Sequence, residues 1–255
     1  MLSKEVVFKM ERDLKNKTIV VTGGAEGIGL QITRYFLKAE AKFVIILDIN
    51  EEKSTIAVED LTKEFGPNKV AYIKCDVVKD LEETFQNIFN EYGIIDVLVN
   101  SAGLVDEDVI ENCVDVNLTA TIKWSLKFME LMRKDHKGNG GTIVNLASIF
   151  GYRITHLVPV YTATKFGVIG FTQSLGHKRR YDKKQVRVIA ICPGFTRTKL
   201  AKRAEELAEM RDNFQWQSSE EVGEKVVEVF KIADSGTLWE IEGGLLREVK
   251  KSAVI

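Results

Sequence analysis

Tyr161 and Lys165 form the pair in this sequence whose residue types and spacing are best suited to acid–base chemistry. Side chains at positions i and i+4 share one face of a helix, so the phenol and the ammonium group would project together. A phenol is a poor base at neutral pH, because its reference pKa is about 10, but a neighbouring ammonium group stabilises the phenolate and lowers that pKa. Ser148 precedes this pair and could hold a substrate oxygen through one hydrogen bond. The three residues together indicate proton transfer to or from an oxygen atom.

A glycine-rich turn, TGGAEGIG, occupies residues 22–29 directly after an apolar run. Glycines at such a turn let the backbone approach a pyrophosphate closely, and the helix that starts there supplies unpaired N–H groups for the phosphates. A strand-to-helix turn that serves only folding would look similar, and a Tyr-x-x-x-Lys pair alone is more often a surface pair. Their joint presence in one chain favours a dinucleotide enzyme. The residues that we expect to contact the cofactor here are Thr22, Gly23, Gly27, Ile28 and Gly29.

Asp48 ends the next apolar run, where a carboxylate can accept hydrogen bonds from the adenosine ribose hydroxyls. An acid that only capped the following helix would occupy the same position. A 2′-phosphate beside Asp48 would place like charges within hydrogen-bonding distance, at a cost of about 1 to 4 kcal/mol. Glu26 adds a second negative charge where an NADP site would favour Arg or Lys. The two acids predict NAD as the cofactor, bound at Asp48 and the adjacent Ile49.

The elements that must position these residues are visible as alternating strand and helix patterns. Short β-branched apolar runs predict strands at 18–21, 42–47, 69–75, 94–100, 141–147 and 186–192. These runs are almost continuously apolar, as in a parallel sheet that helices cover on both faces. We therefore expect an α/β chain with a single doubly wound, Rossmann-like domain over residues 1–255, a parallel sheet of about seven strands, and an N-terminal arm at 1–17.

Further candidates for cofactor binding follow predicted strands, at the sheet edge where open α/β sheets bind ligands. Each of them alone could be a plain turn residue. They are Asp76 and Val77 after the third strand, and Asn100, Ala102 and Gly103 after the fourth.

The overall composition gives no sign of a nucleic-acid partner. The chain has 36 Lys+Arg against 37 Asp+Glu, whereas nucleic acid would require a basic excess on one face. No segment reaches the roughly 20 apolar residues of a membrane span, and Lys4, Glu5 and Lys9 interrupt any signal-peptide core. We expect a cytoplasmic protein without an integral membrane segment. The few His and Cys residues lack the paired spacing of metal ligands, so no metal site is expected.

The ordered set of motifs resembles the short-chain dehydrogenase/reductase family over about residues 17–242. The set comprises TGGAEGIG, Asp48, Asp76-Val77, NSAG at 100–103, Asn117, Ser148, YTATK at 161–165 and PGFTRT at 193–198. The chain departs from the family's usual Asn-Asn-Ala-Gly at Ser101, which could alter a local hydrogen bond.

This resemblance implies a role for each matching residue. Tyr161 would act as the general base in alcohol oxidation, and Ser148 would orient the substrate oxygen. Lys165 would lower the pKa of the tyrosine and bind the nicotinamide ribose, and Asn117 would anchor a proton relay. The residues implied to flank the nicotinamide and its phosphates are Pro193, Gly194, Thr196 and Thr198.

Two segments rich in apolar and aromatic side chains are expected to select the substrate, at 149–158 and 195–216. Leu200, Ala204 and Leu207 would share one face of a helix in the second segment, which could be an amphipathic lid or an ordinary surface helix. Arg153 could pair with a substrate carboxylate. The expected substrate contacts are Ser148, Phe150, Val158, Tyr161 and Phe195.

The sequence thus predicts an NAD-dependent oxidoreductase that interconverts a lipophilic secondary alcohol and its ketone or aldehyde. A non-catalytic NAD-binding sensor or scaffold protein is the alternative, and the intact Ser148, Tyr161 and Lys165 argue against it. A sugar-nucleotide epimerase or dehydratase can also use Tyr-x-x-x-Lys, but the region after the sixth strand leaves little room for a nucleotide-sugar domain. The resemblance implies a homodimer or homotetramer in which the helix 161–175 packs against its symmetry mate.

Overall fold

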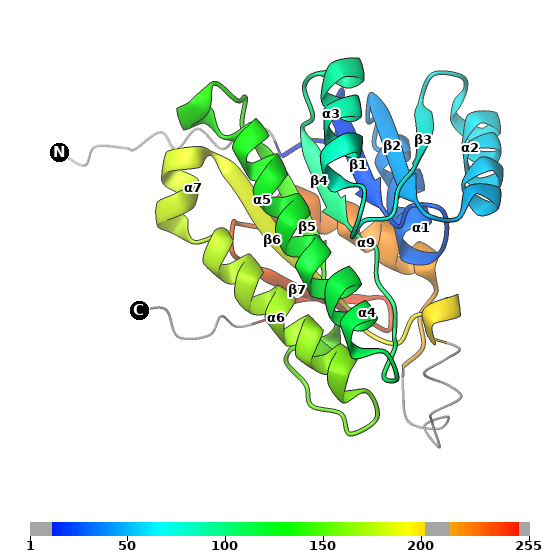
Figure 1. The fold of residues 1–255 in the computed structure, drawn as a ribbon, viewed down its shortest axis with the longest axis vertical. Coiled ribbons are helices and arrows are strands. Elements are labelled where there is room, and N and C mark those ends of the chain that lie inside the picture. Colours follow the sequence, from blue (N-terminus) through cyan, green and yellow to red (C-terminus); the bar gives the residue numbers. More distant parts are fainter. Residues whose placement is uncertain (1–11, 202–214, 250–255) are drawn as a thin grey trace.

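The apolar runs of the sequence form the strands of one eight-stranded sheet in the computed structural model, which describes residues 12–201 and 215–249 (Figure 1). The strand order is β3-β2-β1-β4-β5-β6-β7-β8. All six predicted strands are confirmed, and two more follow them. The strands are β1 (Thr18–Thr22), β2 (Phe43–Asp48), β3 (Val70–Lys74), β4 (Val97–Asn100), β5 (Gly141–Leu146), β6 (Val186–Pro193), β7 (Leu238–Glu242) and β8 (Leu245–Val249).

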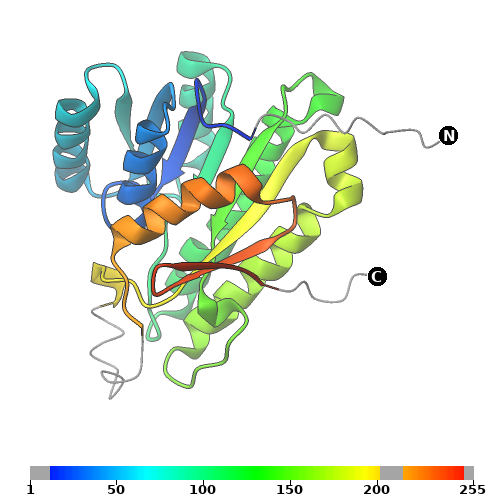
Figure 2. The ribbon, with the colours of Figure 1, turned by 180° about the vertical axis from the view of Figure 1, so that it is seen from behind.

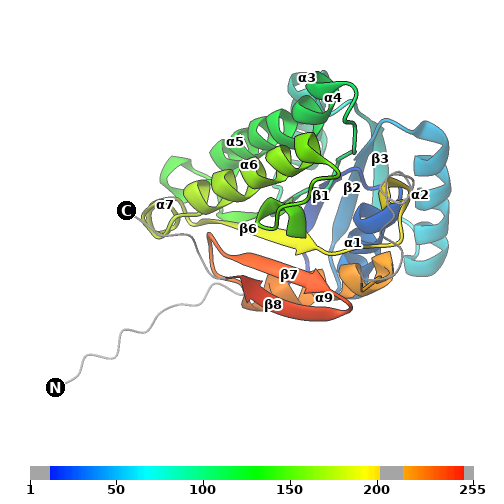
Figure 3. The same cartoon turned by 90° about the horizontal axis from the view of Figure 1, so that it is seen from below.

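Helices cover both faces of this sheet, as the continuous apolar character of the strands predicts (Figure 3). One face carries α1 (Gly27–Lys38), α2 (Glu51–Phe65) and α9 (Ser219–Ile232). Helices α1 and α9 lie side by side on this face (Figure 2). The core beneath them includes Phe36 and Phe230, whose rings meet edge to face at 5.8 Å.

The opposite face carries α3 (Leu81–Tyr92), α5 (Thr121–Met132) and α6 (Pro159–Leu175). Its core is built around the buried side chains of Ile88, Trp124 and Phe128. Shorter elements complete the connections. These are α4 (Ile110–Val114), the π-helical turn η1 (Asp115–Ala120), η2 (Lys134–His136), η3 (Ile149–Gly151) and α7 (Lys178–Lys184).

The sheet has one strand more than expected, because β8 returns antiparallel to β7. Gly243 and Gly244 make this hairpin possible, since both have positive φ angles, 58° and 73°. A two-residue hairpin turn of this kind requires a positive φ at both central positions, which glycine adopts without steric cost. The Gly-Gly pair after Glu242 is a sequence signal from which β8 could have been predicted.

The strand order places the site at the edge of the sheet that is formed by the carboxyl ends of its parallel strands. From β1 the chain moves to β2 and β3 on one side, and then returns to β4 on the other side of β1. The carboxyl ends of β1 and β4 therefore border a crevice, the position at which open α/β sheets bind ligands. The register pairs Thr22 with Asn100 at this edge.

The described part of the N-terminal arm, residues 12–17, lies against the end of α9. Arg12 donates a hydrogen bond to the carbonyl oxygen of Ile232 at 2.7 Å and pairs with Asp234. Residues 1–11 lie outside the described ranges. Within residues 12–201 and 215–249, no helix is both long and apolar enough to cross a membrane.

Candidate active site

A cavity of about 620 Å³ lies at the carboxyl edge of the sheet and brings together most of the predicted site residues. The predicted residues that line it are Gly23, Gly27, Ile28, Gly29, Asp48, Ile49, Asp76, Val77, Ala102, Gly103, Ser148, Phe150, Val158, Tyr161, Lys165, Pro193, Gly194, Phe195, Thr196 and Thr198. Thr22, Asn100 and Asn117 do not line it.

Thr22 and Asn100 support the cavity wall from behind. The hydroxyl oxygen of Thr22 accepts hydrogen bonds from the backbone N–H groups of Ser101 and Ala102, at 3.1 and 3.2 Å. The buried amide of Asn100 donates to the side chains of Ser125 and Asn145. These hydrogen bonds engage both side chains within the protein. Thr22 and Asn100 therefore hold the strand ends in place and do not line the cavity.

The glycine-rich turn fits tightly against the loop after β4. A Cβ atom on Gly23 would lie 2.7 Å from Cα of Ala102, and one on Gly29 would lie 2.1 Å from the carbonyl oxygen of Gly23. Helix α1 begins at Gly27, and no side chain caps its first turn. The unpaired N–H groups of that turn border the cavity, which suits the phosphates of a dinucleotide.

Asp48 lies at the end of β2 and joins the glycine-rich turn to the start of α2. Its carboxylate accepts hydrogen bonds from the backbone N–H of Ala25 at 3.1 Å and of Asn50 at 3.0 Å. Asn50, and not Asp48, caps α2, because the Asn50 side chain accepts a hydrogen bond from the N–H of Lys53. Asp48 also lines the cavity, where its oxygens can meet ribose hydroxyls.

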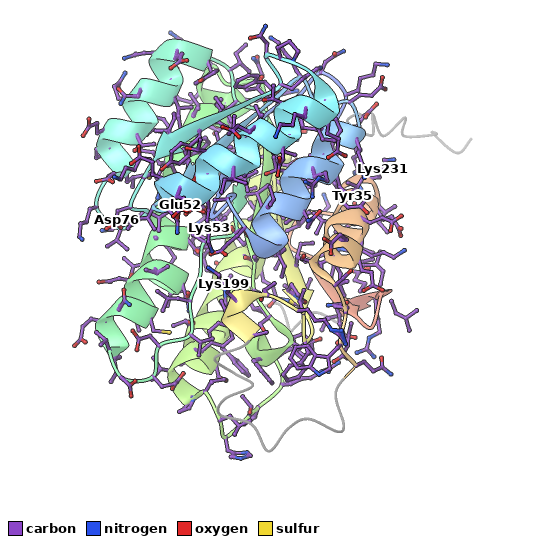
Figure 4. The ribbon with its side chains drawn as sticks, turned by 90° about the vertical axis from the view of Figure 1, so that its right-hand side faces the viewer. Tyr35, Glu52, Lys53, Asp76, Lys199 and Lys231 are labelled. Atoms are coloured by element: carbon purple, nitrogen blue, oxygen red, sulfur yellow. The ribbon has the colours of Figure 1, made fainter. Side chains whose placement is uncertain are left out.

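The second negative charge predicted at Glu26 is compensated by two lysines in the structure. The Glu26 carboxylate pairs with Lys53 of α2, and Nζ of Lys199 lies 3.7 Å from the same oxygen. Figure 4 shows the two lysine side chains next to each other beside the start of α1. Because both lysines come from distant segments, the local sequence around Glu26 could not reveal them. Asp48 alone therefore carries the electrostatic argument against a 2′-phosphate.

Tyr161 and Lys165 lie one turn apart on α6 and are both buried, with Ser148 facing them from the end of β5. Burial raises the pKa of Tyr161 to about 12, although a hydrogen bond with Ser148 opposes this rise. The lowering that the sequence suggested does not occur, because burial outweighs the effect of Lys165, whose Nζ lies 5.4 Å from the tyrosine ring centre and donates to the carbonyl oxygen of Leu146. Burial lowers the pKa of Lys165 to about 8.

Asn117 lies behind the cavity, in the π-helical turn between α4 and α5. Its side chain binds both main-chain groups of Leu104, accepting from the N–H at 2.9 Å and donating to the carbonyl oxygen at 2.8 Å. A Cβ atom on Gly103 would lie 3.2 Å from Oδ1 of Asn117 and 3.7 Å from Nζ of Lys165. Asn117 and Lys165 therefore flank the same glycine, and single π-helical turns occur frequently at functional sites.

Phe150 and Phe195, two of the predicted substrate contacts, line the cavity with aromatic side chains. The ring of Phe195 lies 5.7 Å from that of Phe150 and 5.5 Å from that of Trp216. Leu200 also lines the cavity, whereas Ala204 and Leu207 of the predicted lid lie outside the described residues.

Arg153 is engaged within the protein. Its guanidinium group pairs with Glu240 and makes two hydrogen bonds to Glu242, at 3.0 and 2.9 Å. The suggested pairing of Arg153 with a substrate carboxylate would have to break these contacts.

Sequence reasoning missed two residues that the structure ties to Tyr161. The carboxylate of Glu107 binds the backbone N–H of Tyr161, and the hydroxyl of Thr164 binds its carbonyl oxygen. Glu107 is remote in sequence and carries no motif, whereas Thr164 lies within YTATK. Among the residues of the two described ranges, no cluster of three His, Cys, Asp or Glu side chains could hold a metal ion.

Comparison with known proteins gives a family match over most of the chain. The short chain dehydrogenase family model matches residues 17–209. The 15-hydroxyprostaglandin dehydrogenase [NAD(+)] of Rattus norvegicus is 37% identical over 187 residues, which cover 72% of this chain and 70% of that protein. Alcohol dehydrogenase 1 of Ceratitis cosyra is 29% identical over 248 residues, 92% of this chain and 95% of that protein.

A solved structure confirms the fold. The short-chain type dehydrogenase/reductase from Mycobacterium marinum superposes with a TM-score of 0.80 at 22% identity, covering 92% of this chain and 97% of that one. The sheet of parallel strands with helices on both faces is thus shared at low sequence identity. With the family model matched over residues 17–209, this chain belongs to the short-chain dehydrogenase family of oxidoreductases, which bind a nicotinamide cofactor.

Proposed function

We propose that this protein uses NAD to interconvert a lipophilic secondary alcohol and its ketone or aldehyde. The observation that carries the proposal is a single cavity lined both by Asp48 and the glycine-rich turn and by Ser148, Tyr161 and Lys165. The relatives named as an NAD-dependent hydroxyprostaglandin dehydrogenase and as an alcohol dehydrogenase support the same class of reaction. The bound nicotinamide would supply the hydride acceptor.

Each residue then has a chemical task. Ser148 orients the alcohol oxygen by a hydrogen bond, and Tyr161 takes the hydroxyl proton at its phenolic oxygen. Lys165 supplies the positive charge that favours the phenolate and holds a ribose hydroxyl, and Asn117 fixes the loop behind the proton path. In the reduction direction Tyr161 returns the proton to the carbonyl oxygen.

The apolar wall supports the proposed substrate class. Phe150, Val158 and Phe195 give the cavity a surface that favours an uncharged hydrocarbon group over a sugar or a polar acid. Burial of such a group contributes about 25 cal/mol for each Å² removed from water. We propose that binding strength rises with the length of the hydrocarbon group up to the size of the cavity.

The assembly and the location follow the family pattern in our proposal. Leu126 of α5 and Phe166 of α6 are exposed at 46% and 43%, which supports packing of these helices against a second copy in a homodimer or homotetramer. We propose a cytoplasmic protein, consistent with three buried free thiols, Cys75, Cys113 and Cys192.

The proposal is tested by measuring NADH formation with a panel of short secondary alcohols, terpenols, hydroxy fatty acids and sterols. Tyr161→Phe should lower turnover by about 10²-fold or more while NADH still binds, because the phenol acts in proton transfer. Full activity of this variant would remove Tyr161 from its role. NADH binding without turnover of any alcohol would instead support a sensor or scaffold protein.

A further inference from the structure

The first turn of α6 is capped by a side chain from another part of the chain. Val158, at the N-cap position, makes no side-chain cap, and Pro159 has no N–H group. The next two N–H groups, of Val160 and Tyr161, both donate to the carboxylate of Glu107, each at 2.9 Å and each to a different oxygen. Glu107 therefore satisfies two open donors of this helix, and one of them belongs to Tyr161 itself.

Glu107 lies in the loop between β4 and α4, which contributes Ala102 and Gly103 to the cavity. Its neighbour Asp106 has a different task. The carboxylate of Asp106 accepts a hydrogen bond from the N–H of Val109, the residue before α4, at 3.0 Å. The two adjacent acids thus bind different segments, the chain before α4 and the first turn of α6.

A second connection holds the same loop to the other side of Tyr161. The Asn117 side chain forms hydrogen bonds with both main-chain groups of Leu104 and donates to the hydroxyl oxygen of Thr164 at 3.2 Å. Thr164 in turn donates to the carbonyl oxygen of Tyr161 at 2.7 Å. The peptide groups on both sides of Tyr161 are therefore tied to the loop that lines the proposed cofactor space, and Glu107 makes the direct contact.

We propose that Glu107 is a positioning residue, which fixes the phenol of Tyr161 relative to the cofactor loop. The inference rests on the proposed function, because it takes Tyr161 as the proton acceptor. Hydrogen bonds to an ionised carboxylate are about twice as strong as neutral ones, and the negative charge is favourable at a helix N-terminus. A displacement of about 1 Å in a reacting group can cost about 10²-fold in rate, so a loosened first turn of α6 should be visible in turnover.

The test compares Glu107→Gln and Glu107→Ala with the wild-type protein. Glutamine keeps the shape and one acceptor oxygen, but its amide nitrogen cannot accept the second hydrogen bond. We expect kcat to fall by about tenfold in Glu107→Gln and by about 100-fold in Glu107→Ala. The Kd for NADH should stay within about threefold of wild type, because Asn117 still holds the loop. Glu111→Gln is the matched control, since it removes the same charge from an exposed position on α4 and should leave kcat unchanged.

Several outcomes would overturn the inference. One is a wild-type kcat in Glu107→Gln, and another is a loss of NADH affinity in proportion to the loss of kcat, which would indicate general loosening of the cleft. If Glu107→Ala fails to fold, Glu107→Gln and its control decide the question alone. In a Tyr161→Phe background, Glu107→Gln should cause no further loss of the residual rate. Retained turnover in Tyr161→Phe would contradict the proposed function itself, whereas an inactive Tyr161→Phe beside a fully active Glu107→Gln would contradict only the role of Glu107.

Discussion

Nζ of Lys165 donates a 2.9 Å hydrogen bond to the carbonyl oxygen of Leu146, so the ammonium group is anchored at the end of β5 beside the cavity. The contact fixes the lysine, although burial lowers its pKa to about 8. In the proposed mechanism, a positive charge held in this way would stabilise a phenolate on Tyr161 and bind a ribose hydroxyl.

Lys165→Met tests this role, because methionine has a similar length but neither the charge nor the N–H donors. We expect kcat/KM for alcohol oxidation to fall by about 10²-fold to 10⁴-fold, the range typical of lost acid–base assistance. The measurement is steady-state NADH formation with thermal unfolding as a check of the fold. Lys63→Met, on the exposed side of α2, is the control and should behave as wild type. A loss of less than about threefold in Lys165→Met would contradict the assignment.

The pH dependence follows from the burial of Tyr161, which raises the pKa of the phenol to about 12. A general base works only when deprotonated, and the fraction of phenolate grows as the pH approaches the pKa from below. Oxidation of the alcohol should therefore accelerate from about pH 7 to about pH 8, whereas above pH 8 the loss of the Lys165 charge opposes the further gain of phenolate. Reduction of the ketone, which needs the protonated phenol, should not accelerate with rising pH. The check is kcat/KM in both directions across this range. An oxidation rate that declines with rising pH below about pH 8 would rule out the phenol as the base.

The parts of the site that lie within one helix, strand or turn could be predicted from the sequence, because that element itself fixes the spacing of their residues. Tyr161 and Lys165 share a helix face, and Asp48 ends a β-branched run. The glycine-rich turn is contiguous in the chain, and the structure confirms that it opens α1.

The parts that depend on distant contacts could not be predicted. The pairing of Glu26 with Lys53 and Lys199 joins three separate segments, so the sequence suggested an uncompensated charge where the structure has a compensated one. Burial causes the rise in the pKa of Tyr161, and the i, i+4 spacing of Tyr161 and Lys165 gives no information about burial. Thr22 and Asn100 occupy motif positions, but their side chains make buried hydrogen bonds behind the cavity.

Asp48→Ala should narrow the preference for NAD over NADP. Removing the carboxylate deletes the proposed ribose contact and the repulsion of a 2′-phosphate, which is worth about 1 to 4 kcal/mol and therefore about fivefold or more in the ratio of the two kcat/KM values. Asp60→Ala, at an exposed position on α2 where Asp60 pairs only with Lys63 in the described contacts, controls for the change in net charge. If the ratio is the same in Asp48→Ala and wild type, the ribose assignment is wrong.

Glu26→Gln should raise the use of NADP without reversing the preference. In the structure Glu26 forms ion pairs with Lys53 and Lys199, and Figure 4 shows both lysines near the start of α1. Glutamine would leave both positive charges free to interact with a 2′-phosphate. Partly exposed pairs of this kind contribute about 0.2 to 1 kcal/mol each, so kcat/KM for NADP should increase by about twofold to tenfold, and less at high salt. Asp48 remains in place and keeps NAD the better cofactor. Glu52→Gln is the control, because Glu52 is exposed on α2 beside Lys53 and its replacement removes the same charge but leaves the pairing of Glu26 with Lys53 and Lys199 intact. An equal increase in kcat/KM for NADP in that variant would show that net charge alone causes the effect.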